Sequence, residues 1–213
     1  MSVRVLPAGD AALLIELDSL DAAVSLTRRV RAAALPAVVD LVPAARTLLV
    51  QTADGTDLSA MGRTVLGLAS DLPRQAPDVG AADALVIEVR YDGPDLPAVA
   101  EAAGLNRASV IRAHTETLWR AAFIGFAPGF AYLTGGDPRL RVPRRTESRT
   151  TVPAGAVALA GEFSAVYPRP SPGGWQLIGT TDMVLWDTEA DPPALLQPGR
   201  WVRFVDVTDG SPS

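Results

Sequence analysis

The chain contains no cysteine and no lysine, and these two absences exclude several kinds of enzyme. All 19 basic residues are arginine. Without cysteine there is no thiol nucleophile and no zinc site with cysteine ligands, and such a chain suits a reducing compartment. Without lysine there is no phosphate-binding loop of the Walker type, no Schiff-base chemistry and no amidase with a Ser–Lys pair. If the chain belongs to an enzyme, we expect it to supply only part of the active site.

Histidine, long apolar runs and positive charge are also scarce. His114 is the single histidine, so any Ser-His-Asp triad must use it, and no carboxylate cluster accompanies it to form a metal site. No apolar run approaches the ~20 residues of a membrane helix, and the first residues show no signal-peptide pattern. We therefore expect a cytoplasmic protein that does not contact membranes. The net charge of −5 argues against nucleic-acid binding.

The apolar material that is present, 48% of 213 residues, is enough for a core in one or two domains. Residues 1–78 alternate between strand and helix patterns, which predicts a small α+β domain of the ferredoxin-like kind. The predicted elements are strands at 11–17, 38–42 and 47–51, and helices at 19–35 and 58–72 with Ser19 and Asp57 as N-caps.

After a Pro- and Gly-rich linker the pattern changes to short apolar runs separated by turns. A strand is predicted at 85–91 and short helices at 96–103 and 109–114. Regularly spaced short strands are typical of a sandwich or barrel, so residues 83–213 are predicted to form a β-rich domain. The fold class is therefore α+β, with two domains.

The segment GFAPGFAYL (125–133) places aromatic residues on both sides of a Pro-Gly turn. Phe126, Pro128, Phe130 and Tyr132 could form a pocket rim or an interface. They could equally form a hydrophobic turn that packs on the barrel.

Arginines crowd the segment DPRLRVPRRTESRT (137–150). Arg144, Arg145 and Arg149 are candidates for an anion-binding edge, because a guanidinium group can bind carboxylate or phosphate through two parallel hydrogen bonds. The alternative is a solvated loop whose arginines are paired with neighbouring acids.

The segment SPGGWQLIG (171–179) places two glycines before a tryptophan. Gly173 and Gly174 could adopt positive φ and expose N–H groups as an anion site, with Trp175 packed beneath them. Alternatively the turn only closes a hairpin. His114 could orient substrate or transfer a proton near the same pocket, or it could be a hydrogen-bonded packing residue.

Several segments of the chain closely resemble the allophanate hydrolase subunit 1 family. They are the three segments 125–133, 137–150 and 171–179, together with GDAALLIEL, VPAARTLLV and VRYDGPDL. That family includes the B subunit of bacterial 5-oxoprolinase and the sporulation-kinase inhibitor subunit, and its members contain subdomains C and D of a carboxyltransferase domain. The resemblance covers nearly the whole chain and departs from the family at Ala45 and Arg46, where an aromatic residue is frequent. It implies that the second domain is a cyclophilin-like β-barrel.

The resemblance also implies a function. The chain is expected to be a subunit of an ATP-dependent 5-oxoprolinase that opens 5-oxo-L-proline to glutamate. Its expected partners are subunit 2, a tandem of cyclophilin-like barrels, and a third subunit of the lactam-utilisation type. ATP with Mg²⁺ is expected for the assembled complex and no cofactor for this subunit alone. The alternatives are a regulatory inhibitor that docks on a sensor histidine kinase, and a carboxyltransferase-like component that acts on a urea-type amide.

Overall fold

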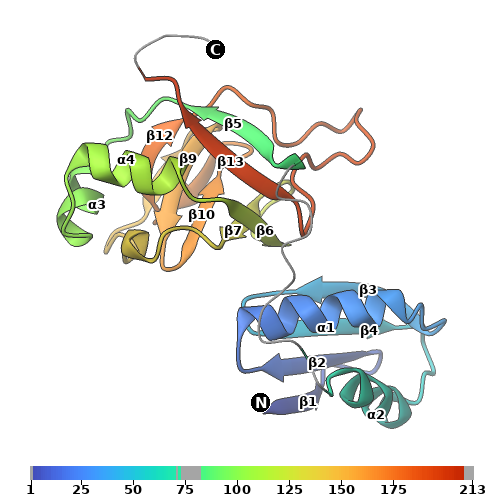
Figure 1. The fold of residues 1–213 in the computed structure, drawn as a ribbon. Coiled ribbons are helices and arrows are strands. Elements are labelled where there is room, and N and C mark those ends of the chain that lie inside the picture. The colour runs from blue at the N-terminus through green and yellow to red at the C-terminus, as the bar shows by residue number, and fades with distance from the viewer. Residues whose placement is uncertain (1, 71, 73–82, 209–213) are drawn as a thin grey trace. The chain divides into compact units, whose positions relative to one another are not determined.

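The chain divides into two compact units, Met1–Asp78 and Val79–Ser213 (Figure 1). The computed structural model describes residues 2–70, 72 and 83–208. The predicted linker and domain boundary lie at residues 73–83, almost entirely outside the described residues. Each unit has a hydrophobic core of its own.

The N-terminal unit is a four-stranded antiparallel sheet covered by two helices. The strand order is β1-β2-β4-β3. The two helices contact each other and pack on the sheet, α1 against β2, β3 and β4, and α2 against β1 and β2. The elements are β1 (Val3–Pro7), β2 (Ala12–Leu17), α1 (Leu20–Ala32), β3 (Val38–Pro43), β4 (Thr47–Thr52) and α2 (Leu58–Leu68).

Both helices of this unit begin where the sequence predicts. The Ser19 hydroxyl accepts a hydrogen bond from the Ala22 N–H, and the Asp57 carboxylate accepts one from the Ala60 N–H. Such N-caps satisfy backbone donors that the first helical turn leaves unpaired.

Strand β1 is absent from the prediction, because its five residues end in proline and carry only a short alternating pattern. It lies beside β2, where a cross-strand ion pair joins Arg4 to Glu16 at 2.8 Å. In the usual ferredoxin-like arrangement, this place belongs to a strand that follows the second helix. The strand–helix–strand–strand–helix series is confirmed, whereas the name ferredoxin-like stays a prediction.

Helix α1 is followed by a strained residue that offers a simple test of stability. Ala34 has φ +45°, the left-handed conformation in which a β-carbon is unfavourable and glycine is preferred. We expect Ala34→Gly to stabilise the N-terminal unit by about 1 kcal/mol, as measured by calorimetric unfolding. Ala33→Gly is the matched control, because Ala33 has φ −70° and glycine there should destabilise the unit. Equal effects of the two substitutions would contradict this account.

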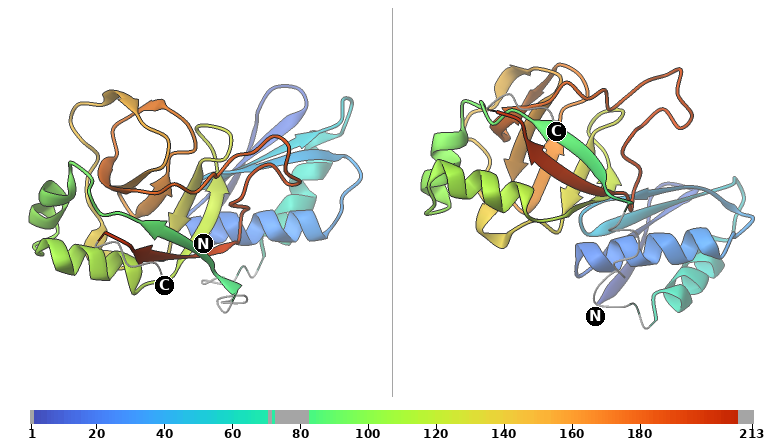
Figure 2. Two further views of the ribbon diagram at one scale, coloured as in Figure 1. Left: turned by 90° about the horizontal axis from the view of Figure 1, so that it is seen from above. Right: turned by 45° about the horizontal axis from the view of Figure 1, so that its top comes forward.

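The C-terminal unit is a seven-stranded sheet that nearly closes on itself (Figures 1 and 2). The strand order is β12-β9-β10-β7-β6-β13-β5, and a bridge between Arg90 and Thr180 joins its two edges. This confirms the α+β fold class and the cyclophilin-like barrel. Its strands are β5 (Leu85–Val89), β6 (Trp119–Ile124), β7 (Ala131–Thr134), β9 (Ala156–Ala160), β10 (Phe163–Val166), β12 (Gln176–Thr180) and β13 (Trp201–Asp206).

Two helices and a small second sheet complete this unit. Helices α3 (Leu96–Ala102) and α4 (Arg107–Thr115) pack against each other, with α3 on β12 and α4 on β13. The second sheet pairs β8 (Arg149–Val152) with β11 (Ser171–Gly173). Gly93, before α3, lies so close to β12 that a β-carbon would be 2.3 Å from the Ile178 carbonyl carbon. None of the described helices has the length and apolar character needed to span a membrane.

Candidate functional site

One wall of the barrel is buried on both faces. In β9, Val157 and Leu159 belong to the barrel core, whereas Ala156, Ala158 and Ala160 belong to a separate cluster on the outer face. The division follows from strand geometry, since successive side chains point to opposite faces of a sheet. The small alanine side chains leave room outside the barrel for a layer of large aromatic rings.

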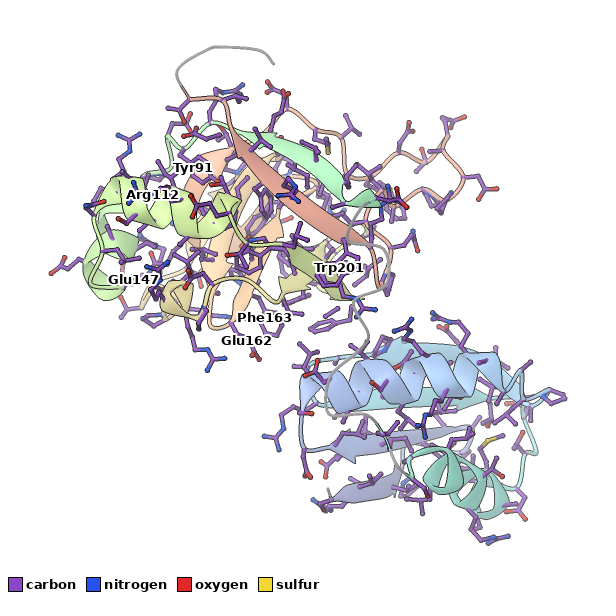
Figure 3. The ribbon with its side chains drawn as sticks, viewed as in Figure 1. Tyr91, Arg112, Glu147, Glu162, Phe163 and Trp201 are labelled. Carbon is purple, nitrogen blue, oxygen red and sulfur yellow. The ribbon has the colours of Figure 1, made fainter. Side chains whose placement is uncertain are left out.

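Phe130 lies at the centre of this aromatic layer. Its ring centroid is 5.2 Å from that of Tyr132, 5.1 Å from Tyr167 and 5.6 Å from Trp175, each in an edge-to-face arrangement. Such pairs contribute about 0.5–1.5 kcal/mol each beyond burial. Phe163, labelled in Figure 3, extends the layer beside Tyr132. Phe130 itself is only 1% exposed, so it lies beneath the surface, as in the alternative of a hydrophobic turn that packs on the barrel, and not at a rim.

Phe126 is the exposed member of the layer. It lies in the turn between β6 and β7, is 60% exposed and contacts Phe130 with ring centroids 5.2 Å apart. Its φ of +69° is a left-handed conformation that costs a bulky residue about 1–2 kcal/mol. Strain of this kind concentrates at functional positions. Phe126, together with the exposed Pro128, therefore forms an apolar rim.

Arg144 lies over the aromatic layer. Its guanidinium carbon is 6.0 Å from the centroid of the Trp175 ring, within the range of a cation–π interaction. Burial raises the pKa of both Tyr132 and Tyr167, and the positive charge of Arg144 partly offsets this rise. Within the described part of the chain, Arg144 has no carboxylate partner and neither phenol hydroxyl has a hydrogen-bond partner.

The other two predicted arginines are engaged by a buried carboxylate. Arg149 donates two hydrogen bonds to Asp95, at 2.8 and 2.9 Å, and Arg145 donates a third at 2.7 Å. The backbone N–H of Leu177 donates a fourth at 2.7 Å. Burial opposes ionisation of Asp95, but the hydrogen bonds from Arg149 and Leu177 and the two positive charges hold its pKa below the usual value.

Of the three arginines predicted to form an anion-binding edge, only Arg144 therefore lacks a carboxylate partner among the described residues. Arg145, in the loop before β8, and Arg149, the first residue of β8, are both held by Asp95, the residue that precedes α3. This matches the alternative in which arginines pair with neighbouring acids. Only Arg144, among these three, is directed to another partner.

The two glycines before Trp175 serve close packing and not positive φ. A β-carbon on Gly173 would lie 2.3 Å from the Tyr167 hydroxyl, and one on Gly174 would lie 2.9 Å from the Ser148 hydroxyl. Neither glycine has positive φ, and the Gly174 carbonyl accepts a hydrogen bond from the Arg145 N–H. The geometry expected for an anion-binding turn is therefore missing.

The hairpin alternative for this turn also differs from the structure. Strand β11 pairs with β8, and β12 pairs with β9, so the strands on the two sides of the turn are not partners. The turn instead carries the chain from the small sheet to the barrel. Trp175 is buried within the aromatic layer.

His114 lies in the interior of the barrel, on the other side of the wall from the aromatic layer. It is fully buried, its Nδ1 is 2.7 Å from the Tyr91 hydroxyl and its Nε2 is 2.9 Å from the Ser164 hydroxyl. Its ring also stacks on Phe204 with centroids 4.2 Å apart. Burial lowers the pKa of His114 to about 3, so the imidazole is neutral at physiological pH. This position matches the hydrogen-bonded packing role and places the imidazole away from the proposed pocket.

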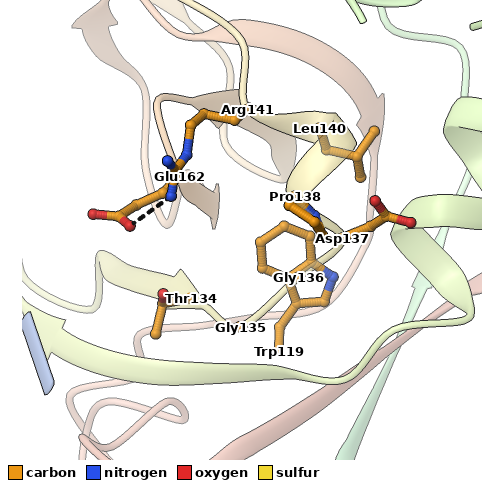
Figure 4. A pocket seen from close by; sticks show the side chains of 9 residues that line it. All are labelled: Trp119, Thr134, Gly135, Gly136, Asp137, Pro138, Leu140, Arg141 and Glu162. Atoms are coloured by element: carbon orange, nitrogen blue, oxygen red, sulfur yellow. Dashed lines mark hydrogen bonds and ion pairs between the residues drawn. The ribbon is translucent and has the colours of Figure 1, made fainter. Parts of the chain in front are cut away.

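A hollow of about 220 Å³ lies beside Trp119, away from the aromatic layer (Figure 4). Its charged groups are already paired, because Arg141 contacts Glu162 at 3.3 Å and Asp137 accepts hydrogen bonds from Arg139. It therefore offers fewer free groups to a ligand than the aromatic layer does. In the described ranges, no three or more acidic or histidine side chains are grouped so that they could hold a metal ion.

Two residues of this region, Asp95 and Tyr167, are not among those predicted from the sequence. Asp95 carries no local signal, because its partners Arg145 and Arg149 follow 50 and 54 residues later. Tyr167 could have been found from alternation, since Phe163 and Ala165 of the same segment also point outward.

Known proteins similar to this chain include the B subunit of 5-oxoprolinase from Escherichia coli O157:H7. It is 47% identical over 118 residues, which are 55% of this chain and 54% of that protein. The chain thus spans about half the length of the curated relatives it matches.

Two solved structures have the same fold. The crystal structure of TTHA0988 is 33% identical with a TM-score of 0.74, and the match covers 100% of this chain and 41% of that one. The urea amidolyase of K. lactis is 21% identical with a TM-score of 0.71, over 97% of this chain and 15% of that one, and this likeness concerns the fold alone.

The model of one protein family matches residues 3–196, nearly the whole chain. The match confirms the resemblance seen in the sequence motifs. The chain belongs to the family described as carboxyltransferase domain, subdomain C and D.

Proposed function

We propose that this chain is one subunit of a hydrolase complex of the 5-oxoprolinase type, which uses ATP to open the cyclic amide of 5-oxo-L-proline. The name of the E. coli relative supports the reaction class. The observation that carries the proposal is the outer aromatic layer. Arg144, which has no carboxylate partner among the described residues, lies over Trp175, and the exposed Phe126 contacts Phe130 and Tyr167 of the same layer. A positive charge beside an apolar rim suits a small ring that bears a carboxylate.

The layer offers binding groups but few groups that could perform chemistry. His114 is enclosed in the barrel, and Asp95 is saturated by four hydrogen bonds. A water molecule or a phosphoryl group would therefore have to be activated by other subunits. We propose that subunit 2 and a third subunit of the lactam-utilisation type complete the site in a hetero-oligomer.

The groups in this layer do not fit ATP and Mg²⁺ by themselves. A triphosphate is usually held by several donors, including backbone N–H groups or lysine, and Mg²⁺ by carboxylates and phosphate oxygens. Here Arg145 and Arg149 are already bound by Asp95, and Arg144 is one cation. We assign ATP with Mg²⁺ to the assembled complex and no cofactor to this chain alone.

Reconstitution tests this function. The chain alone should show no ATP hydrolysis dependent on 5-oxo-L-proline, and adding it to the other two subunits should restore that activity. Phe126→Ala should lower kcat/KM of the complex about tenfold, the effect of losing ~1.4 kcal/mol of contact with substrate or partner. Val39→Ala, which removes an exposed apolar group in the N-terminal unit, is the matched control. Robust turnover by the chain alone, or by a complex that lacks it, would refute the proposal.

Phe126 also supports the second candidate function, a regulator that docks on a sensor histidine kinase. An exposed aromatic residue held in a strained turn suits an anchor at a protein interface. Under this alternative, the purified chain would inhibit kinase autophosphorylation, Phe126→Ala would relieve the inhibition, and 5-oxo-L-proline would have no effect.

A further inference from the structure

The polar groups of the aromatic layer can all act as hydrogen-bond donors. Arg144 can only donate, and the hydroxyls of Tyr132 and Tyr167 can each donate one hydrogen bond. Arg144 and Tyr132 both contact Trp175, whose ring centroid is 6.0 Å from the Arg144 guanidinium carbon and 5.5 Å from the Tyr132 ring centroid. Tyr167 contacts Phe130, which also contacts Trp175, and the charge of Arg144 acts on both phenols.

The Tyr167 hydroxyl is available to a ligand. The residue is only 1% exposed, but its hydroxyl is not among the fully enclosed polar atoms and has no hydrogen-bond partner among the described residues. Glycine at position 173 lets this hydroxyl lie against the backbone, because a β-carbon there would be 2.3 Å from it.

The residues around Arg144 favour a negatively charged ligand. The buried carboxylate of Asp95 is paired with Arg145 and Arg149 and makes no ion pair with Arg144. An anion with two oxygens could accept from Arg144 and from the two phenols together. Phe126, exposed at the rim, offers an apolar surface to the rest of such a molecule.

We propose that Arg144, Tyr132 and Tyr167 bind the carboxylate of a small cyclic acid whose ring packs against Phe126. This deepens the proposed function and rests on it, because it assigns recognition of the substrate carboxylate to this chain. The phosphates of ATP are bound elsewhere in the complex.

Binding to the full chain can be measured without turnover. The Trp175 indole N–H signal in two-dimensional NMR spectra should shift and saturate with 5-oxo-L-proline at millimolar concentration, as expected for a small ligand held by few contacts. The neutral 5-oxo-L-prolinamide should bind at least about tenfold more weakly, since it lacks the charge that Arg144 recognises. Inorganic phosphate and ATP should not compete.

Conservative variants locate the site. Tyr167→Phe and Arg144→Gln should each weaken binding about tenfold, the effect of losing a hydrogen bond to a charged group. The matched controls are Tyr91→Phe, whose hydroxyl contacts His114, and Arg141→Gln, whose side chain pairs with Glu162. Both controls should bind like the original chain.

The outcomes separate this inference from the proposed function. Equal binding of the amide, competition by phosphate, unchanged binding by Tyr167→Phe, or no saturable shift would each overturn the carboxylate site. If the complex still hydrolyses ATP with 5-oxo-L-proline in those cases, the proposed function stands without it. Binding with the predicted selectivity by a chain whose complex is inactive would support the site and refute the function.

Discussion

The C-terminal unit is expected to lose stability as the pH falls below about 6.5, with a slope that approaches about 1.4 kcal/mol per pH unit near pH 5, because His114 cannot be protonated inside the barrel. In the unfolded chain this imidazole has a pKa near its ordinary value of about 6.5. In the folded chain burial lowers the pKa to about 3. Below pH 6.5 the unfolded state therefore binds a proton that the folded state does not, so acidification favours unfolding.

Urea unfolding followed by tryptophan fluorescence measures this effect. All four tryptophans lie in the C-terminal unit, so the signal reports that unit. His114 is the only histidine, and its replacement in His114→Gln should flatten the dependence over this range while carboxylates remain ionised. A slope in the original chain no steeper than in His114→Gln would show that the imidazole titrates normally in the fold.

Asp95→Ala is expected to destabilise the same unit by about 3 kcal/mol, the lower end of the range for breaking a buried ion pair. The substitution leaves Arg145 and Arg149 without their carboxylate and Leu177 N–H without its acceptor. The lower end applies because the two arginine side chains remain 34% and 23% exposed and can be partly hydrated.

Asp182→Ala is the matched control for this prediction. Asp182 also accepts two hydrogen bonds from an arginine, Arg90, but the pair lies at the surface with the carboxylate side chain 84% exposed. Surface pairs of this kind contribute little. Urea unfolding should therefore show a clear loss for Asp95→Ala and almost none for Asp182→Ala. Similar losses would mean that the burial of Asp95 does not determine its contribution.

Local sequence signals predicted the elements of the fold well. Ser19, Asp57 and Asn106 each accept a backbone N–H at the start of a helix, and such caps depend only on residues within one turn. The change to short strands after residue 83 likewise predicted a sandwich or barrel, and the family resemblance implied the barrel. Strand β1 was missed because its pairing with β2, and not its own pattern, stabilises it.

The candidate site was harder to predict because its residues meet through tertiary structure. The arginine partners of Asp95 lie 50 and 54 residues away in sequence. The pairing of these arginines with Asp95 therefore could not be predicted from local sequence. The positive φ of Phe126 is imposed by its turn and contradicts the ordinary preference of a bulky residue. His114 did carry a signal, since Val110 and His114 are four residues apart on the buried face of α4.

The alternation of β9 has a consequence for how such a protein can change over time. The inner residues Val157 and Leu159 pack in the barrel core, while Ala156, Ala158 and Ala160 pack against the aromatic rings outside it. A methyl group added at one of these alanines would push the rings outward and shift Arg144 with Trp175, without entering the barrel. The outer surface can thus change shape through residues buried beneath it, while the barrel keeps its own core intact.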